Sequence, residues 1–217
     1  MISRIRNWTS KGIVWPPIDF ELNEYREKGL LNGLVLNAGA GWRDISDLVT
    51  GTLVNQDLTW PEDNRTNIDI FSPLHQIPRE DNTFDTILCI AVLEHVENPE
   101  EVVPELYRVL KPGGNLIASV PFLQPEHKVP TDYQRYTKDG LIRLFSHHGF
   151  TVIETKPLFS VYHTIHWIVY EWLHLKNSIL YKALRVLILP ALAWLARRSR
   201  LQSDVLASVF QIHATKS

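Results

Sequence analysis

The feature that most constrains the fold is an alternation of short apolar runs with helical segments, which begins near residue 33. Near-continuous apolar runs separated by helices are typical of a parallel β-sheet with helices on both faces. The predicted strands are residues 33–38, 52–57, 67–70, 84–91, 115–120 and 150–154, with 207–214 as a last strand. The predicted helices between them are 99–110 and 137–148. The pattern therefore predicts an α/β protein.

The length of 217 residues, with 45% hydrophobic and 21% charged residues, fits one globular domain. We divide it into a helical lead-in (1–32), a core (33–157), an apolar and basic helical insertion (158–200) and a closing strand (201–217). The first 20 residues have no continuous apolar run, so no secretory signal is predicted. The single cysteine, Cys89, excludes an intrachain disulfide and is expected to be a buried small hydrophobe. These features favour a cytoplasmic protein.

The formal net charge of -2 conceals an uneven distribution of charge along the chain. Residues 1–155 contain 14 basic and 22 acidic residues, whereas 156–200 contain seven basic residues and only Glu171 as an acid. The near-neutral total argues against a nucleic-acid partner. An acidic body joined to a basic segment predicts two surfaces with different partners.

A pair of glycines follows the first predicted strand. Gly39 and Gly41 stand where this strand is expected to turn into a helix, and such a turn lets backbone N–H groups approach a ligand closely. Arg43 occupies the place of the third glycine of the dinucleotide-binding pattern. Asp57 ends the second strand, where a carboxylate can accept both ribose hydroxyls of a nucleoside. The alternatives without a ligand are that the glycines only allow the backbone to turn and that Asp57 is only a solvated side chain at the end of the strand.

Three further segments carry a resemblance to a known family. They are DNTFDTILC at 81–89, VLEHV at 92–96 and RVLKPGG at 108–114. In this order and spacing they resemble class I S-adenosylmethionine-dependent methyltransferases of the type 11 branch, over residues 34–153, and 209–215 is similar to the closing strand of that family. The resemblance implies a Rossmann-like sheet of seven mostly parallel strands. It also implies S-adenosyl-L-methionine as the cofactor, lying over the carboxyl ends of the first strands.

The resemblance assigns roles to individual residues. Gly39 and Gly41 would line the methionine part of the cofactor, and Asp57 would hold the ribose. The full set of candidate cofactor residues is Asn37, Gly39, Gly41, Asp57, Asp69, Asp85, Ala91 and Leu93.

Two positions depart from the family pattern. Asn37 stands where the family usually has an acidic residue, so a charge near the cofactor is missing and weaker binding is expected. Pro73 stands where relatives often place the aspartate that contacts the adenine amino group, and Asp69 lies four residues earlier.

A segment after the predicted fifth strand, HKVPTDYQRYT at 127–137, resembles one found in a subset of these enzymes. Many of that subset are encoded with bacterial envelope polysaccharide or lipid-linked glycan genes, and the segment would lie over the methyl group. The candidate catalytic residues are His127, Asp132, Tyr133, Arg135 and His95. A neutral imidazole can remove a proton from a hydroxyl acceptor. In the structural alternatives Asp132 and Arg135 only pair to hold the loop, and His95 only bonds the backbone.

Three other histidines, His163, His166 and His174, share an apolar segment without a carboxylate at metal-ligand spacing. We interpret them as core or interfacial side chains, and no metal site is predicted.

The insertion, 158–200, predicts two or three apolar helices. Its uncharged runs, 158–170 and 186–196, fall short of the roughly 20 residues that span a bilayer, and Pro190 interrupts the second. Trp194 among leucines and basic residues suits a helix lying in a membrane interface. A helical pair that packs on its own core or on a second subunit, as in a homodimer, is the alternative.

The leading interpretation is a methyltransferase that acts on a small-molecule, glycan or lipid-linked acceptor, in cell-envelope polysaccharide biosynthesis, in the cytoplasm or peripheral to the inner face of the membrane. A non-catalytic cofactor-binding or scaffolding protein is the second, favoured by Asn37 and Pro73. A nicotinamide-dependent oxidoreductase is the third, and the missing third glycine argues against it.

Overall fold

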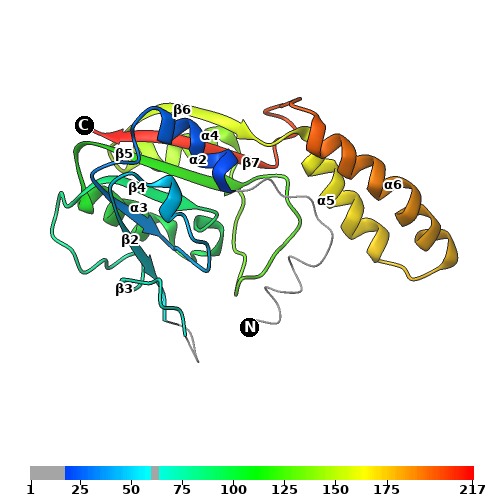
Figure 1. Ribbon diagram of the computed structural model, residues 1–217, viewed down its shortest axis with the longest axis horizontal. Coiled ribbons are helices and arrows are strands. Elements are labelled where there is room, and N and C mark those ends of the chain that lie inside the picture. The colour runs from blue at the N-terminus through cyan, green and yellow to red at the C-terminus, as the bar shows by residue number, and fades with distance from the viewer. Residues whose placement is uncertain (1–17, 60–63) are drawn as a thin grey trace.

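One seven-stranded sheet organises the protein, in the order β3-β2-β1-β4-β5-β7-β6 (Figure 1). The computed structural model describes residues 18–59 and 64–217. The strands are β1 Leu34–Ala38, β2 Thr52–Asp57, β3 Ile70–Phe71, β4 Phe84–Ile90, β5 Leu110–Pro121, β6 Phe150–Leu158 and β7 Val209–Lys216. The helices are α2 Ile18–Glu27, α3 Pro99–Val109, α4 Lys138–His147, α5 Val161–His174 and α6 Ile179–Arg198, with 3-10 helices η1 Ser46–Leu48 and η2 Leu93–His95.

The pairing confirms the predicted mostly parallel sheet. β3, β2, β1, β4 and β5 pair in parallel, and β7 runs antiparallel between β5 and β6. Parallel neighbours end at the same edge, so the segments after β1, β2, β4 and β5 share one side of the sheet. Of the predicted lead-in, α2 lies within the described residues and 1–17 lie outside them.

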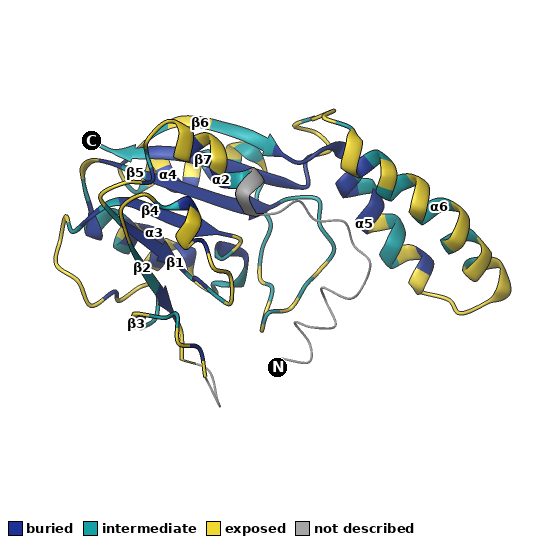
Figure 2. Cartoon of the chain, in the orientation of Figure 1, coloured by how far each residue is buried: buried dark blue, intermediate teal, exposed yellow. Residues whose placement is uncertain are grey.

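Each face of the sheet packs against different helices. On one face, Leu22 and Tyr25 of α2 pack against Val35, Leu88 and Ile117. On the other face, α3 and α4 cover the larger core, which contains Cys89 as the buried small side chain that the sequence predicts. The sheet is accordingly the most buried part of the molecule (Figure 2).

The segment after β1 corrects the predicted strand-to-helix turn. No α-helix begins at Gly41, and only the short η1 follows, at Ser46–Leu48. The turn is bonded to the neighbouring strand instead, since the Ala40 N–H donates to the Gln56 carbonyl (2.9 Å). β5 also begins earlier than the predicted strand 115–120, at Leu110, directly after α3 ends at Val109.

The insertion forms two helices, α5 and α6, which pack against each other and project from the body of the protein (Figure 1). α6 is continuous over 20 residues, so the expectation that Pro190 interrupts it was wrong. The carbonyl of Val186 loses its helical partner at Pro190, and Val186 is exposed, so water can bond to it. By length and composition α6 is long and apolar enough to cross a membrane, so the prediction that the insertion has no run of that length was wrong. Little of α6 is buried.

The histidines of α5 partly follow the prediction. His163 and His166 are buried, whereas His174 is exposed. His163 caps the helix, since its Nδ1 accepts from the Ser160 N–H (3.2 Å), and burial lowers the pKa of His163 to about 4.

Gly51→Ala will destabilise the fold more than Gly113→Ala. A Cβ at Gly51 would lie 2.1 Å from the Gly33 carbonyl oxygen, so the backbones that start β1 and β2 must separate. A Cβ at Gly113 meets nothing within 4 Å and only incurs the cost of its positive φ, about 1–2 kcal/mol. Urea titration should give a loss of about 3 kcal/mol or more for Gly51→Ala. Equal losses for the two variants would contradict the crowding at Gly51.

Candidate active site

The turn after β1 lies against the end of β2 and is held by its side chains. Gly39 (φ 69°) and Gly41 (φ 61°) both adopt left-handed backbone conformations. The Gly39 N–H donates to Gln56 Oε1 (3.1 Å), and the Gly41 N–H donates to Asp57 Oδ2 (2.8 Å). A Cβ at Gly39 would clash with Val92 at 2.6 Å, whereas a Cβ at Gly41 would meet nothing within 4 Å. The surface beside Gly41 therefore lies open to a ligand.

The Asp57 carboxylate is buried and largely occupied by partners within the protein. Besides the Gly41 N–H, it accepts from the Leu58 N–H on Oδ1 (2.7 Å) and from Arg65 Nη1 on Oδ2 (2.5 Å). A carboxylate offers about four acceptor positions, so one remains on Oδ1. Sequence reasoning missed Arg65, because nothing in its loop signals a partner at the end of β2.

Arg65 itself lies between two exposed aromatic rings. Its guanidinium carbon is 5.5 Å from the centroid of Trp42 and 6.0 Å from that of Phe71, within cation–π range. The rings stand beside Asp57 and give this end of β2 a mixed aromatic and cationic surface.

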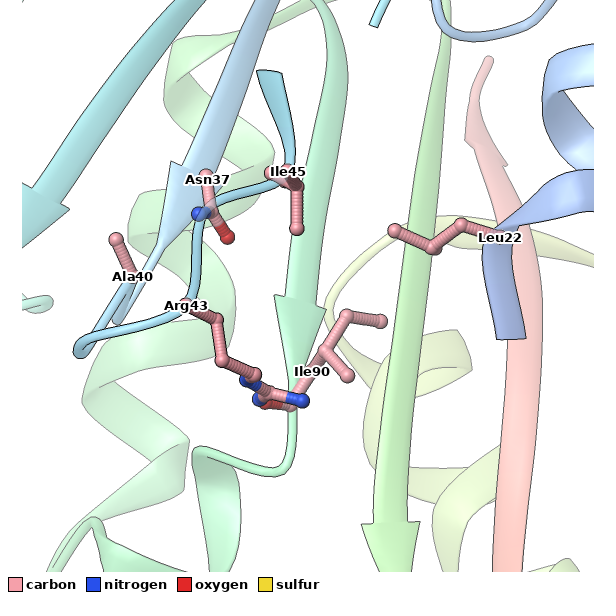
Figure 3. Close-up of a pocket in the computed structure, with 6 residues that line it drawn as sticks. All are labelled: Leu22, Asn37, Ala40, Arg43, Ile45 and Ile90. Carbon is pink, nitrogen blue, oxygen red and sulfur yellow. The ribbon is translucent and has the colours of Figure 1, made fainter. Parts of the chain in front are cut away.

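A narrow hollow lies behind the turn, between β1, β4 and α2 (Figure 3). It has about 10 Å³ of space, enough for about one water molecule. Arg43 reaches across it and donates from Nη2 to the carbonyl of Ile90 (2.7 Å). Asn37 is buried beside it and donates from Nδ2 to Asn55 Oδ1 (2.9 Å). Asn37, which replaces the acidic residue usual in the family, is thus bonded to the neighbouring strand β2.

Three of the candidate cofactor residues have structural roles. Asp85 is the second residue of β4, at the amino ends of the strands and away from the turn after β1. Its carboxylate accepts from the Leu34 N–H (2.8 Å) and pairs with Lys111 (2.7 Å). Asp69 is exposed and accepts from the Asn55 N–H (2.8 Å). Leu93 is fully buried in the core. These contacts give Asp85, Asp69 and Leu93 structural roles, and their contact with the cofactor stays a prediction from the family resemblance.

The segment after β4 carries a strained residue and a fixed histidine. Ala91 is exposed with φ 55°, a left-handed conformation that is uncommon outside glycine and concentrates at functional sites. His95 ends η2, and its Nδ1 lies 2.5 Å from the Thr131 carbonyl oxygen. The segment after β4 is in this way tied to the loop after β5.

In the loop after β5, His127 points toward Glu94, and the Asp132–Arg135 pair holds the shape of the loop. Arg135 pairs with both carboxylate oxygens of Asp132, and Asp132 Oδ2 also accepts the His127 N–H (2.7 Å). Arg135 bonds the carbonyls of Pro125 (3.2 Å) and Gln134 (2.8 Å) as well. Asp132 and Arg135 therefore pair with each other and hold the loop, as the structural alternative in the sequence analysis describes.

The last predicted catalytic residue of the loop, Tyr133, is about half exposed. Its N–H donates to the Glu94 carbonyl (2.8 Å), so the backbone of the loop after β5 is bonded directly to η2.

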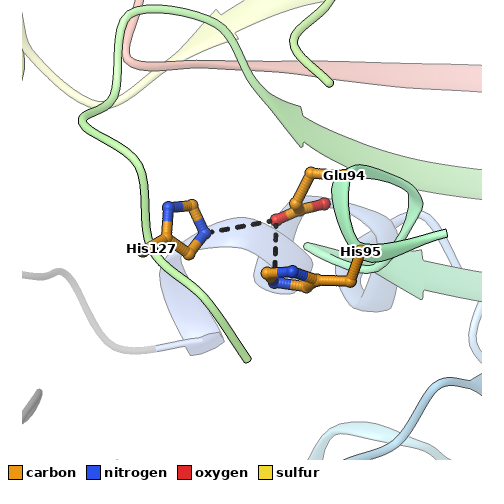
Figure 4. Close-up of side chains that lie close together, drawn as sticks. All are labelled: Glu94, His95 and His127. Carbon is orange, nitrogen blue, oxygen red and sulfur yellow. Dashed lines mark ion pairs between the residues drawn. The ribbon is translucent and has the colours of Figure 1, made fainter. Parts of the chain in front are cut away.

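A carboxylate that sequence reasoning passed over lies between the two histidines (Figure 4). Glu94 is fully buried, and its Oε1 is 3.8 Å from His95 Nε2 and 3.7 Å from His127 Nε2. The rings of His95 and His127 meet edge to face, with their centroids 5.3 Å apart. Glu94 stands inside the 92–96 segment next to His95, which was the available signal.

A second carboxylate borders this cluster from α2. Glu21 accepts from the Ser119 hydroxyl (3.1 Å). Burial raises the pKa of Glu21, and the negative charge of Glu94 adds to the rise while Arg43 opposes it. The raised pKa favours the neutral, protonated form of Glu21 beside the Glu94 carboxylate.

Comparison with known proteins agrees with this geometry. Residues 49–118 match the family described as "Methyltransferase domain". The match covers about a third of the chain. Its fold resembles a SAM-dependent methyltransferase from Archaeoglobus fulgidus, with a TM-score of 0.60 and 15% identity over 92% of this chain and 93% of that one. It also resembles the [4+2]-cyclase SpnF, with a TM-score of 0.57 and 15% identity over 91% and 81% of the two chains.

A curated relative shares part of the sequence. The ubiquinone/menaquinone biosynthesis C-methyltransferase UbiE of Ruegeria sp. is 34% identical over 77 residues, which is 36% of this chain and 26% of the relative. The chain spans between about a quarter and two fifths of the length of the first curated relatives that it matches.

The residues at the strand ends fit the cofactor of this fold class. The open side of Gly41 is a cradle that a Cβ would fill, and it adjoins the remaining acceptor position on Asp57. A nucleoside with ribose hydroxyls can use both, provided that Arg65 yields part of the Asp57 carboxylate when a second hydroxyl binds.

Asp132→Asn will loosen the loop after β5 in a pH-dependent way. Burial raises the pKa of Asp132, but hydrogen bonds from Arg135 and the His127 N–H outweigh it and hold the pKa below its usual value of 3.8. The carboxylate thus stabilises the fold above pH 3.8, and this contribution is lost as the pH falls through the lower folded value. Removing one partner of a buried pair costs about 3 kcal/mol.

Urea titrations at pH 7 and at pH values below 4 will measure this difference between the wild-type protein and Asp132→Asn. We expect the difference to shrink in acid. Asp139→Asn, an exposed change in the adjoining helix, is the control. A difference that stays constant with pH would contradict the role of the carboxylate.

Proposed function

We propose that the chain is an S-adenosyl-L-methionine-dependent methyltransferase that acts on a small-molecule, glycan or lipid-linked acceptor. The observation that carries the proposal is a convergence at one edge of the sheet. A nucleoside cradle at the ends of β1 and β2 stands beside a buried cluster of Glu94, His95 and His127 after β4 and β5. The matched family and the fold support the same reaction class.

The first group of residues positions the cofactor. S-adenosylmethionine supplies a methyl group on a sulfonium, which is a good leaving group, so alignment is the main demand on the protein. Gly39 and Gly41 let the chain approach the ligand closely, and Asp57 accepts hydrogen bonds from ribose. Asn37 is neutral and bonded to Asn55, so we expect affinity to depend mainly on Asp57.

The second group handles the acceptor. Glu94, His95 and His127 lie after the strands next to β1, and the loop that carries His127 is braced by the Asp132–Arg135 pair. A hydroxyl acceptor must lose a proton as it is methylated. The cluster is the group of titratable side chains best placed to promote that loss. Arg135 acts as a positioning residue, because its guanidinium is used within the loop.

The alternative is a cofactor-binding protein that does not transfer a methyl group. The fold similarity to a [4+2]-cyclase shows that this architecture occurs in proteins with other activities, and Asn37 removes a family charge. The buried acidic and imidazole cluster favours catalysis, because a scaffold would gain nothing from such an unfavourable burial of charge.

Asp57→Ala will weaken cofactor binding at least tenfold, or about 1.4 kcal/mol. The measurement is calorimetric titration with S-adenosylmethionine and S-adenosylhomocysteine. Asp57→Asn, which keeps the shape beside Gly41, separates loss of the charge from a packing defect. Asp69→Ala is the matched control, since Asp69 is exposed and bonds only the neighbouring backbone. Failure of the intact protein to bind either compound would overturn the proposed function.

We further propose that the α5–α6 hairpin attaches the protein to a membrane surface and brings the site to acceptors there, including envelope glycan precursors. α6 exposes Ile179, Val186 and Leu187 to solvent within the described residues, and Arg197 and Arg198 close its last turn. An apolar face with adjacent basic residues suits an interface that contains anionic lipid. The relative UbiE, named for quinone biosynthesis, is compatible with an apolar acceptor.

Leu187→Glu will reduce binding to vesicles that contain phosphatidylglycerol, because it places a charge on the apolar face of α6. Co-sedimentation with such vesicles and with neutral phosphatidylcholine vesicles measures the effect, and the wild-type protein should prefer the anionic ones. Ile153→Glu is the control, since Ile153 is also exposed but lies on β6. The proposal would be contradicted if the wild-type protein does not bind vesicles and forms a dimer that Leu187→Glu dissociates. A second subunit would then cover α6 instead.

A further inference from the structure

The buried carboxylate of Glu94 is electrostatically incomplete. Neither of its oxygens has a hydrogen-bond partner among the described residues, although the side chain is fully buried. A buried carboxylate without partners is costly, and proteins normally pair it with a cation or bind a metal ion to it. By contrast, Asp57 and Asp132 are each paired with an arginine. Glu94 therefore stands out among the buried acids of the strand ends.

The neighbours of Glu94 do not supply the missing hydrogen bonds. His95 Nε2 and His127 Nε2 lie 3.8 and 3.7 Å from Oε1, beyond the length of a hydrogen bond. A carbonyl oxygen only accepts, so the Thr131 carbonyl at 2.5 Å requires the proton of His95 on Nδ1. In the neutral ring Nε2 then directs a lone pair, not a proton, toward the side of Glu94. A carbonyl that orients the ring in this way is common around histidines that ligate metals.

The spacing of the three groups matches a small coordination site. One ligand atom from each of Glu94, His95 and His127 lies within 4.8 Å of the others. A tetrahedral ion with bonds of about 2.1 Å separates its ligand atoms by about 3.4 Å. The distances from Glu94 Oε1 to the two imidazoles exceed this by only about 0.3–0.4 Å. The imidazole ligand atoms lie within 4.8 Å of each other, so the rings of His95 and His127 would turn toward each other to close the site.

We propose that Glu94, His95 and His127 bind a divalent transition-metal ion. Two imidazoles and one carboxylate suit zinc or ferrous iron, whereas magnesium prefers oxygen ligands. Three protein ligands leave at least one coordination position open, as in catalytic sites. The Asp132–Arg135 pair orients the loop that carries His127, and the Thr131 carbonyl orients His95. Both outer contacts come from the 127–137 segment that the sequence analysis singled out.

The role of the ion rests on the proposed function. An acceptor hydroxyl bound at the open position would have a lowered pKa and would lose its proton to solvent water more readily. Its oxygen would then take the methyl group as the carbon–sulfur bond of the sulfonium breaks, which releases S-adenosylhomocysteine. The acceptor class that this favours has an oxygen nucleophile, such as a hydroxyl of a glycan or a phenol.

Titration with zinc ion alone tests the site without any activity assay. The metal-free wild-type protein should bind one Zn²⁺ per chain by calorimetry, and elemental analysis after dialysis should find the same stoichiometry. Zn²⁺ should also raise its Tm, since the ion binds the folded state. Glu94→Gln, His95→Asn and His127→Asn should each weaken binding about 100-fold or more, a loss at least as large as that from outer contacts. Glu94→Gln is nearly isosteric, so it keeps the fold.

A second histidine–carboxylate pair on the surface provides the matched control. His148 Nε2 lies 2.6 Å from Glu100 Oε2 on α3. Among the described residues this pair belongs to no group of three possible metal ligands. His148→Asn should leave zinc affinity unchanged. The proposal is overturned if the wild-type protein binds no stoichiometric zinc, if the three site variants bind it as tightly as wild type, or if His148→Asn weakens binding equally.

Measurement of S-adenosylmethionine affinity on the same variants separates this proposal from the proposed function. Glu94→Gln should lose zinc and keep cofactor binding, whereas Asp57→Ala should lose cofactor binding and keep zinc. Zinc binding in a protein that does not bind the cofactor would uphold the metal site and overturn the methyltransferase.

Discussion

The parallel pairing of β1 with β2 and β4 is the constraint on which the rest of the structure depends. It places Ala38 beside Gln56 and leads β4 to end near the same edge, so the chain leaves these strands in a common direction. The amino ends are secured by Asp85, which accepts the Leu34 N–H, and by the close contact of the Gly51 and Gly33 backbones. The turn after β1, Asp57 and the segment after β4 are placed by this register.

The strand ends hold buried charge in two different ways. Asp57 and Asp132 are compensated within the protein by Arg65 and Arg135, so their contacts stabilise a turn and a loop. Glu94 has imidazoles at a distance that is too long for hydrogen bonds and suitable for an ion between them. Burying a carboxylate that is paired with an arginine costs little free energy, whereas burying one without a partner is unfavourable unless a ligand binds to it. This difference is the basis of the proposed metal site.

The α5–α6 hairpin differs from the other helices in how much of its apolar surface is exposed. Helices α2, α3 and α4 bury one face against the sheet, while α6 leaves apolar side chains exposed along its length. Exposed apolar surface of this kind in a globular protein marks an interaction with another surface. In the proposed attachment to a membrane, the basic residues Arg197 and Arg198 at the end of α6 would face anionic lipid.

The sequence by itself determined the sheet, because burial of parallel strands requires apolar runs that remain visible in any sequence. β2 lies at 52–57 as predicted, and β1, β4 and α3 agree to within a residue. It also indicated Gly41 and Asp57 as candidate site residues, because Gly41 stands in the turn after β1 and Asp57 is the last residue of β2.

Only the tertiary structure decided which charges are paired. Asp85 and Glu94 stand in similar motif positions, yet Asp85 anchors the amino edge and Glu94 is buried between two histidines. His127 reaches Glu94 across 33 positions of sequence, a contact that depends on the β4–β5 pairing and on the shape of one loop. Local patterns report burial and turns, whereas electrostatic partners are set by three-dimensional distance, which no local pattern contains.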